Sequence, residues 1–290
     1  MLVKENFLFV EYNGVSYPQE YSGKIKEVAA HLDKEAIDYA ECYSLHTEYS
    51  YGKRKLDSSL LSSFSALRTA NKDNVPQLWY SNEWSDEFAT FIIQLTNGLQ
   101  APKIIEIHPP FSDYCTLDEF CERYRIFEKK IHAIYPETLI VIENRAGSVY
   151  HGGKFLFGKS TEIAALCSAI KNYKLDLAIV LDFPQLLTAE GIDTLKFKTE
   201  KYQKAINTLS SYCNLIKGIH IWGKKKGATG RWVAHAGNLN TYFGGNKETK
   251  SLFIEGIAQI CSNGMKRFLV PEVNSGAADL ASIMSDLFCS

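Results

Sequence analysis

Hydrophobic residues along this chain fall into two alternating kinds of segment. Segments of the first kind hold five or six residues, are mostly apolar and are too short for a helix, which is typical of buried strands. Segments of the second kind space apolar residues three or four positions apart, which is typical of amphipathic helices. Strands are predicted over residues 7–12, 39–43, 75–80, 103–108, 139–143, 177–182, 216–220 and 267–272. Helices are predicted over residues 25–32, 60–69, 87–99, 117–134, 161–173, 199–212, 250–261 and 277–288, with Ser160 as the N-cap of the helix over 161–173.

The order of these segments indicates the fold class. Short strands that alternate with helices form βαβ units, which build a parallel sheet. Eight such strands in 290 residues suit an α/β protein consisting of a single (β/α)8 TIM barrel. No repeat, low-complexity stretch or linker divides the chain, so we expect residues 1–290 to form one domain.

Composition narrows the setting in which the protein works. The net charge of −1 gives the whole chain no general attraction to nucleic acid, although it leaves room for a local basic patch. No apolar run approaches the roughly 18 residues of a membrane helix, and the N-terminus lacks the shape of a signal peptide. Seven scattered cysteines without a CxxC pair indicate reduced thiols. We therefore expect a cytoplasmic protein without a membrane association, and no obligate protein partner is evident.

Four of the predicted strands end in side chains that bind metals. Glu143, Asp182, His220 and Glu272 each close an apolar run. The C-terminal strand ends of a parallel barrel converge on one mouth, so these groups are expected to meet there. Three carboxylates and an imidazole suit a divalent ion, with Zn²⁺ or Mn²⁺ favoured. The alternative is that each is an ordinary strand-end polar group with its own salt-bridge partner.

Several runs together resemble a known group of barrels. Residues 105–109 read Ile-Glu-Ile-His-Pro, and residues 142–147 read Ile-Glu-Asn-Arg-Ala-Gly. With Asp182, His220 and Glu272, these runs resemble the xylose-isomerase-like superfamily, and within it endonuclease IV, the family-2 apurinic endonucleases. The resemblance covers residues from about 100 to 275. It adds His108 and His235 to the expected metal ligands, and it implies that Glu143 and Glu272 combine metal binding with acid–base catalysis.

The chain also departs from the family pattern. Gln185 stands where the family has a second ligand after its aspartate, and Val233 stands where it has an aspartate before the last histidine. The early strand-end histidine of the family is expected near residues 79–81, which contain none. The family's three-zinc cluster therefore cannot be carried over whole, and we expect one to two divalent ions.

A basic segment follows the strand that ends at His220. Residues 223–231 contain Lys224, Lys225, Lys226 and Arg231 among three glycines. This composition is typical of a solvated loop, but at a barrel mouth it would also suit a phosphate or phosphodiester. Arg145, two residues after Glu143, could hold an anionic substrate in the same way.

The chain also contains a pattern that resembles a phosphate-binding loop. Residues 153–160 match GxxxxGK[ST], but the segment does not directly follow a strand and its interior is bulky. We therefore expect no nucleotide cofactor.

Three functions fit these residues. The first is a divalent-metal-dependent hydrolase that cleaves a phosphodiester or a phosphorylated sugar with metal-activated water, with a nucleic acid as the main candidate substrate. The second is a metal-dependent isomerase or epimerase of a small sugar, in which Glu143 and Glu272 transfer protons at carbon. The third is a barrel that binds a sugar or nucleic acid without catalysis.

Overall fold

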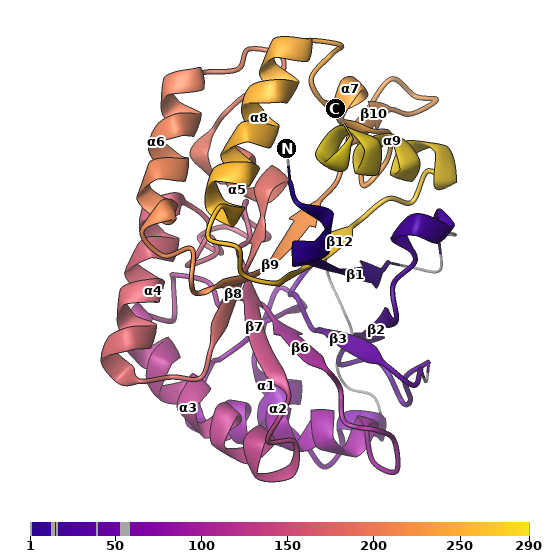
Figure 1. The fold of residues 1–290 in the computed structure, drawn as a ribbon. Helices are drawn as coiled ribbons and strands as arrows, with labels where there is room; N and C mark the ends of the chain where they lie inside the picture. Colours follow the sequence, from indigo (N-terminus) through magenta and orange to yellow (C-terminus); the bar gives the residue numbers. More distant parts are fainter. Residues whose placement is uncertain (1, 13–14, 16, 39, 53–58, 290) are drawn as a thin grey trace.

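Eight parallel strands close into a barrel in the computed structural model, which describes all residues except 1, 13–14, 16, 39, 53–58 and 290 (Figure 1). Each strand pairs with its neighbours in the order β1-β12-β9-β8-β7-β6-β3-β2, and β2 pairs with β1 to close the ring. The barrel strands are β1 (Phe7–Glu11), β2 (Ile25–Ala30), β3 (Tyr43–Thr47), β6 (Ile104–Ile107), β7 (Leu139–Glu143), β8 (Ala178–Asp182), β9 (Ile216–Ile221) and β12 (Arg267–Pro271). The predicted (β/α)8 barrel is therefore confirmed.

Six of the eight predicted strands lie in the barrel, and the other two predictions are wrong. Residues 25–32, predicted as a helix, contain strand β2, which pairs with β1 and β3. Pairing on both sides overrides the helical spacing of this short segment. The strand predicted over 39–43 shares only Tyr43 with β3, and residue 39 lies outside the described residues. Residues 75–80 contain only β5 (Val75–Pro76), which pairs with β4 (Asn71–Lys72) outside the barrel.

Most predicted helices are confirmed, some with shifted ends. The α-helices are α1 (Ser65–Thr69), α2 (Asn82–Leu95), α3 (Leu117–Ile134), α4 (Ser160–Tyr173), α5 (Phe183–Glu190), α6 (Thr199–Ser210), α7 (Leu239–Tyr242), α8 (Lys247–Cys261) and α9 (Ala277–Phe288). The 3-10 helices are η1 (Lys4–Asn6), η2 (Gln19–Tyr21) and η3 (Ser59–Leu61). Ser160 is the first residue of α4 rather than its N-cap, a place that Lys159 takes. Helices α5 and α7 were not predicted.

The helical layer around the barrel is uneven. Helices α3, α4, α6 and α8 lie side by side against one half of the barrel, and they follow one another along its edge in Figure 1. Within the described residues, the connections from β1 to β2 and from β2 to β3 contain η2 but no α-helix. Tyr12, His31 and Tyr49, which follow β1, β2 and β3, line a cavity at the mouth.

Successive side chains along each strand point alternately to two hydrophobic cores. Outward residues of the central strands pack against the helices, whereas inward residues fill the barrel. The inward group is Val10, Ile104, Val141, Ala178, Val180, Phe268 and Val270. Gly218 of β9 leaves room for the Phe268 ring, because a Cβ built there would lie 2.1 Å from the ring. One step further along each strand, the inward residues become polar.

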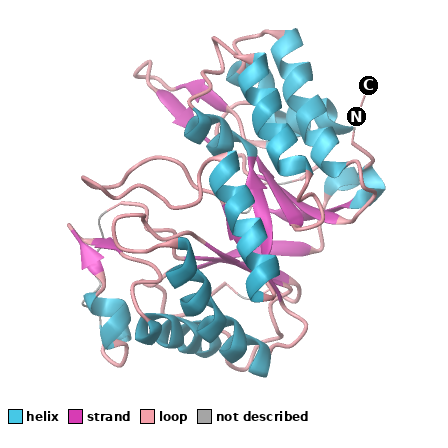
Figure 2. Cartoon of the chain, turned by 90° about the vertical axis from the view of Figure 1, so that its left-hand side faces the viewer, coloured by secondary structure: helices cyan, strands magenta, loops and turns pink. Residues whose placement is uncertain are grey.

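Two small sheets stand outside the barrel. Strands β10 (Lys224–Lys226) and β11 (Trp232–Ala234) form an antiparallel hairpin after β9, and β4 pairs with β5. Figure 2 shows both small sheets projecting from the same side of the molecule. In the part of the chain that the structure describes, no helix is long and apolar enough to cross a membrane.

Candidate metal centre

Strand alternation places the polar groups of the mouth. On β7 and β8, Glu143 and Asp182 follow the inward residues Val141 and Val180 by two positions. His220 of β9 lies opposite Asp182 in the ladder, and Glu272 follows the inward residue Val270 of β12. All four predicted strand-end residues therefore reach one end of the barrel, and each is at most 4% exposed.

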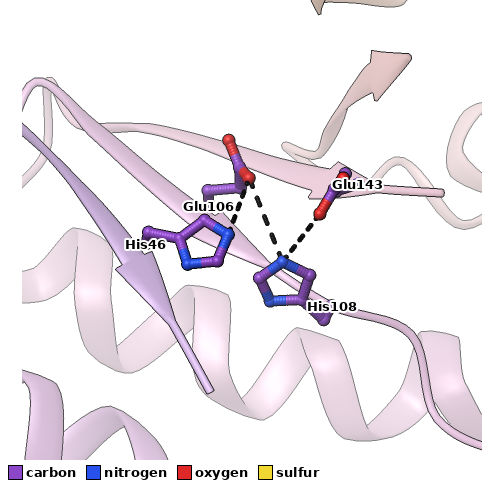
Figure 3. A group of neighbouring side chains, drawn as sticks. All are labelled: His46, Glu106, His108 and Glu143. Carbon is purple, nitrogen blue, oxygen red and sulfur yellow. Dashed lines mark hydrogen bonds and ion pairs between the residues drawn. The ribbon is translucent and has the colours of Figure 1, made fainter. Parts of the chain in front are cut away.

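A first group of four side chains lies where β3, β6 and β7 adjoin. His46, Glu106, His108 and Glu143 each offer an atom within 4.8 Å of the atoms of the others. His108 Nε2 lies 2.9 Å from Glu143 Oε2, and His46 Nε2 lies 3.5 Å from Glu106 Oε1. Figure 3 shows the two imidazoles and two carboxylates pointing toward one another. We call this set the inner cluster.

A second group shares Glu143 with the first. Glu143, Asp182 and His220 also place an atom each within 4.8 Å of the other two, and so do Glu27, His220 and Glu272. His220 Nδ1 lies 3.1 Å from Glu272 Oε1 and 3.8 Å from Glu143 Oε1. We call Glu143, Asp182, His220 and Glu272 the outer cluster. These are the four strand-end residues of the prediction, and they belong to two groups that share His220; their binding of a single ion stays a prediction.

Neighbouring groups fix the orientation of these side chains. His108 Nδ1 lies 3.2 Å from the backbone oxygen of Glu48, an arrangement in which Nδ1 donates and Nε2 faces the inner cluster. Asp182 accepts hydrogen bonds from the Gln185 amide at 2.7 Å and from Trp222 Nε1 at 2.8 Å. Such outer contacts hold metal ligands in place in other proteins.

Asn144, which follows Glu143 at the end of β7, makes two hydrogen bonds to the backbone of Asp182. Its side-chain oxygen accepts from the Asp182 amide at 2.8 Å, and its side-chain nitrogen donates to the Asp182 carbonyl at 3.1 Å. These two bonds tie the end of β7 to the end of β8. The Glu-Asn pair therefore sets the spacing between two carboxylates of the outer cluster.

The charges of the site strongly influence one another. Burial raises the pKa of Asp182 well above its usual range, and the carboxylates of Glu143 and Glu272 add to this effect. Burial also raises the pKa of Glu143, but Arg145 and His108 outweigh it and hold that pKa well below the usual range. Burial lowers the pKa of His220, yet Glu106 and Glu272 raise it well above 6.5. In the absence of another cation, protons must therefore offset part of the negative charge.

Unpartnered buried atoms indicate that the site fits a divalent ion. Within the described residues, Glu106 Oε1, Glu143 Oε1 and both ring nitrogens of His220 are buried and make no hydrogen bond. Each of them lies within 3.9 Å of an oppositely charged group, so only ion pairs compensate their burial, and buried polar atoms without hydrogen bonds are costly in a protein interior. Imidazole nitrogens and carboxylate oxygens are the ligands that Zn²⁺ and Mn²⁺ bind. The donor set thus fits one or two divalent ions.

Two histidines lie in other elements than the sequence analysis predicted. His46, which falls outside the predicted strands and helices, lies on β3 and belongs to the inner cluster. The barrel strand that pairs with β6 on this side is therefore β3 rather than residues 75–80, and β3 carries His46 near its end. His31, expected in a helix, follows β2 and lines the cavity at the mouth.

His235 stands apart from both clusters but contacts the outer one. Its Nδ1 lies 3.1 Å from Glu272 Oε2, and its ring stacks against Trp222 at 4.7 Å. The residues at the two other positions where the family has ligands do not act as ligands here. The Gln185 side-chain oxygen accepts a hydrogen bond from the Ala146 amide, and Val233 is exposed on β11. Among the described residues, the groups that could hold a metal ion do not include His235, and its expected role as a ligand stays a prediction.

Sequence reasoning missed Glu106 and Glu27. Glu106 precedes His108 by two residues in a predicted strand, so the period of two placed it on the same face, and this signal could have identified it. Glu27 lay in the segment wrongly predicted as a helix, which concealed its inward position on β2.

A cavity of about 600 Å³ opens at the mouth, and it is lined by Glu272 of the outer cluster and His46 of the inner cluster. Its walls come from strand β2 and from the segments after β1, β3, β7, β9 and β12, and include Tyr12, Glu27, Tyr49, Arg145, His235 and Glu272. Arg145 Nη1 lies 3.4 Å from Glu143 Oε2, and its guanidinium lies over the Tyr49 ring. Arg145 therefore joins the metal ligands to the cavity wall.

The basic segment after β9 is a hairpin at the edge of this cavity. Lys224 and Lys226 lie over the ring of Trp232, which is 43% exposed, whereas Lys225 pairs with Asp279 at 3.1 Å. Arg231 is exposed near the hairpin turn. The cavity lining includes Ala234 and His235 but none of these four cations. Their role in binding substrate stays a prediction.

The segment that resembles a phosphate-binding loop already has partners for its N–H groups. The amides of Gly158 and Lys159 donate to Glu162, and the amide of Ser160 donates to Glu190. Because carboxylates occupy these donors, the start of α4 does not offer them to a phosphate.

Comparison with known proteins gives structural matches only. No protein-family model matches the chain, and no curated protein matches it. A crystal structure of AsfvAP:AG is similar over 97% of this chain and 98% of its own, at 13% identity and a TM-score of 0.54. A family-2 AP endonuclease from Brucella melitensis matches over 94% and 96% of the two chains, at 11% identity and a TM-score of 0.47. A xylose isomerase domain protein from Alicyclobacillus acidocaldarius subsp. acidocaldarius matches over 97% and 95%, at 11% identity and a TM-score of 0.45.

The predicted resemblance to this group of barrels is thereby confirmed as a likeness of fold. A shared fold does not assign an activity, because one barrel architecture supports many chemistries. The function has to be argued from the site.

Proposed function

We propose that this protein is a divalent-metal-dependent hydrolase that cleaves a phosphodiester. The observation that carries the proposal is the outer cluster of three carboxylates and one imidazole, which reaches a cavity through Glu272, with Arg145 in the same cavity wall. A divalent ion bound by these residues would supply Lewis-acid activation of water and charge neutralisation at phosphate.

Each residue of the site has a definable part in this reaction. Arg145 offers a planar guanidinium to a substrate oxygen, and its contact with Glu143 holds that fork in position. Glu272, between His220 and His235, can accept a proton from the attacking water. Lys224, Lys226 and Trp232 on the hairpin suit the backbone and bases of an extended nucleic acid.

A second candidate is a sugar isomerase or epimerase in which Glu143 and Glu272 transfer protons at carbon. The observation that favours it is the acidic cavity wall, where Glu27 and Glu272 both face the substrate space. Carboxylates repel a polyanion but hydrogen-bond readily to hydroxyl groups. A barrel that binds such ligands without turnover is the third candidate.

The test is a parallel assay of metal-free and metal-loaded protein. Zn²⁺ or Mn²⁺ should restore cleavage of abasic, nicked or single-stranded oligonucleotides, and a panel of aldoses and ketoses should stay unchanged. Asp182→Asn should abolish the activity, whereas Asp176→Asn, an exposed residue just before the other end of β8, should retain it. Turnover of a sugar instead of an oligonucleotide would establish the second candidate, and metal-dependent binding without any turnover would establish the third.

A further inference from the structure

A second cavity, of about 360 Å³, adjoins the one at the mouth. One side of its wall comes from the segment between β7 and α4 and from the first turn of α4, and the other side comes from the C-terminal half of α5. Its volume lies in the range of about 300–1,000 Å³ that is typical of small-molecule sites. None of the residues of the inner or outer cluster lines it, so a ligand held there would not be one that the metal centre binds.

Arg145 separates the two cavities and lines both of them. Its guanidinium carbon lies 5.3 Å from the centre of the Tyr49 ring in the first cavity and 6.0 Å from the centre of the Phe155 ring in the second. Within the described residues, its Nη1 donates to Glu143, whereas its Nε is buried and makes no hydrogen bond. A buried donor without a partner is costly, so this guanidinium favours an acceptor that the protein itself does not supply.

Positive charge gathers around the second cavity. Lys154 and Lys159 line it together with Arg145, and Glu162 is the one carboxylate among the described residues of its wall. Glu162 is already engaged, because its Oε2 accepts from the amides of Gly158 and Lys159 and its Oε1 lies 3.7 Å from Lys154 Nζ. Both lysines are exposed, so their ammonium groups can reach a ligand. The side-chain cations, rather than the occupied amides of α4, therefore suit an anionic group.

The rest of the wall is largely apolar. Phe155 contributes an aromatic ring, and the facing wall of α5 contributes the small side chain of Ala189. Gly158 lets these two walls approach, because a Cβ built there would lie 2.7 Å from the backbone oxygen of Arg145 and 3.3 Å from the Ala189 Cβ. An aromatic ring next to cations suits a nucleotide, in which a flat base is joined to a phosphate.

We propose that the second cavity binds the nucleotide next to the phosphodiester that is cleaved, with its phosphate at Arg145, Lys154 and Lys159 and its base against Phe155. The inference rests on the proposed hydrolase function and names its substrate class, which is a nucleic-acid strand with a phosphate on each side of this nucleotide. Arg145 then lies between two neighbouring phosphates. The cations of the second cavity also offset the repulsion between a polyanion and the carboxylates of the first.

The first test measures binding without metal or turnover. Adenosine monophosphate and adenosine are titrated into chelated protein in a calorimeter. The monophosphate should bind to the wild type, and the affinity should fall by at least about 10-fold in Lys154→Ala with Lys159→Ala, because two charged contacts are lost. Ala189→Leu, which narrows the cavity without changing its charge, should weaken binding as well. Adenosine should bind at least about 10-fold more weakly than the monophosphate.

The matched control is Lys103→Ala with Lys171→Ala, which removes the same charge from exposed positions at the other end of the barrel. This variant should bind the monophosphate as the wild type does. An equal loss of affinity in the control would overturn the site, because it would reduce the effect to net charge.

The second test compares two substrates of the metal-loaded enzyme. A dinucleoside monophosphate carries only the phosphodiester that is cleaved, whereas a trinucleotide adds the neighbouring phosphate. In Lys154→Ala with Lys159→Ala, KM should rise by about 10-fold for the trinucleotide and stay unchanged for the dinucleoside monophosphate, with kcat unchanged for both. Equal changes in KM for the two substrates would overturn the assignment of the neighbouring phosphate to this cavity.

The outcomes separate this inference from the proposed function. Absence of monophosphate binding to the chelated wild type, or equal affinity in all variants, would overturn the nucleotide site even if the enzyme cleaves oligonucleotides. Adenosine that binds as tightly as the monophosphate would overturn the phosphate contacts. Conversely, monophosphate binding that the cavity variants weaken, together with inactivity on every phosphodiester, would retain the nucleotide site and refute the hydrolase.

Discussion

Arg145 is the residue that links metal binding to substrate binding. It contacts Glu143, lies over the Tyr49 ring and lines the cavity. Arg145→Ala should lower kcat/KM by about 100-fold, because a preorganised cationic donor in a water-poor site is lost. Arg145→Lys should recover only part of this, since an ammonium group cannot make the paired contacts of a guanidinium.

The matched control is Arg125→Ala, which removes an exposed arginine on α3 away from the cavity. Kinetics and zinc content should be measured together, because Arg145 also neutralises a metal ligand. Unchanged kinetics in Arg145→Ala would show that the guanidinium serves only to stabilise Glu143.

The titration of His220 predicts how the metal-free protein responds to pH. Burial lowers its pKa, but Glu106 and Glu272 raise the pKa well above 6.5. A group with a raised folded-state pKa stabilises the fold fully below its unfolded pKa, and the contribution is lost as pH rises through the folded value. Asp182 acts in the same direction, because its raised pKa makes ionisation at higher pH unfavourable in the folded state.

The free energy of unfolding of chelated protein should therefore fall as pH rises above about 6.5. The pKa values of Glu143 and Glu272 are lowered, so the stabilisation that these two carboxylates contribute is constant above about pH 6.5 and is lost only in acid. Denaturant unfolding from pH 6 to 9, with and without bound metal, checks this. A pH-independent free energy in the chelated protein would contradict the assignment of His220.

The β10–β11 hairpin is the element that distinguishes the two main candidate functions. Lys225 is already paired with Asp279, so Lys224, Lys226 and the exposed Arg231 are the cations of the hairpin available to phosphate. If the substrate is a nucleic acid, Lys224→Ala with Lys226→Ala should reduce the slope of log K against log salt by about 1.8 for duplex DNA.

The control replaces two exposed lysines at the opposite end of the barrel, Lys103 and Lys171. This double variant should leave the salt slope of oligonucleotide binding unchanged. Binding that is independent of salt in the wild type as well would exclude an electrostatic nucleic-acid interface and favour an uncharged sugar.

Metal binding at the mouth connects strands from the whole length of the chain. The ligands of the two clusters come from β3, β6, β7, β8, β9 and the end of β12. Chelation leaves their carboxylates facing one another, and it removes a ligand that binds only the folded state. At metal concentrations of about 100 times Kd, the loss is about 2.7 kcal/mol, or about 5–10 °C in melting temperature.

Calorimetry with and without chelator measures this difference for the whole molecule. The combined variant Glu106→Gln and Asp182→Asn, with one ligand removed from each cluster, should show a smaller shift on chelation. Equal melting temperatures of loaded and chelated wild-type protein would mean that the clusters hold no ion under these conditions.

The sequence by itself determined the barrel and much of its outer cluster. Apolar runs ending at Glu143, Asp182, His220 and Glu272 specified both the strands and their common end, because buried parallel strands have a strong local signature. Helix α3 has the bounds predicted from its amphipathic spacing, a local feature, and the structure adds a capping box at Thr116, which is local as well.

Only the tertiary structure decided the inner cluster. Strand β2 resembles a helix in isolation and becomes a strand through pairing with β1 and β3, which moves β3 and His46 into the barrel. Glu106 gains its meaning from His46 and His220, which lie on β3 and β9. Such contacts join residues more than fifty positions apart in the sequence. Periodicity specifies which face of a strand a side chain occupies, whereas strand order in the closed barrel determines which side chains it meets.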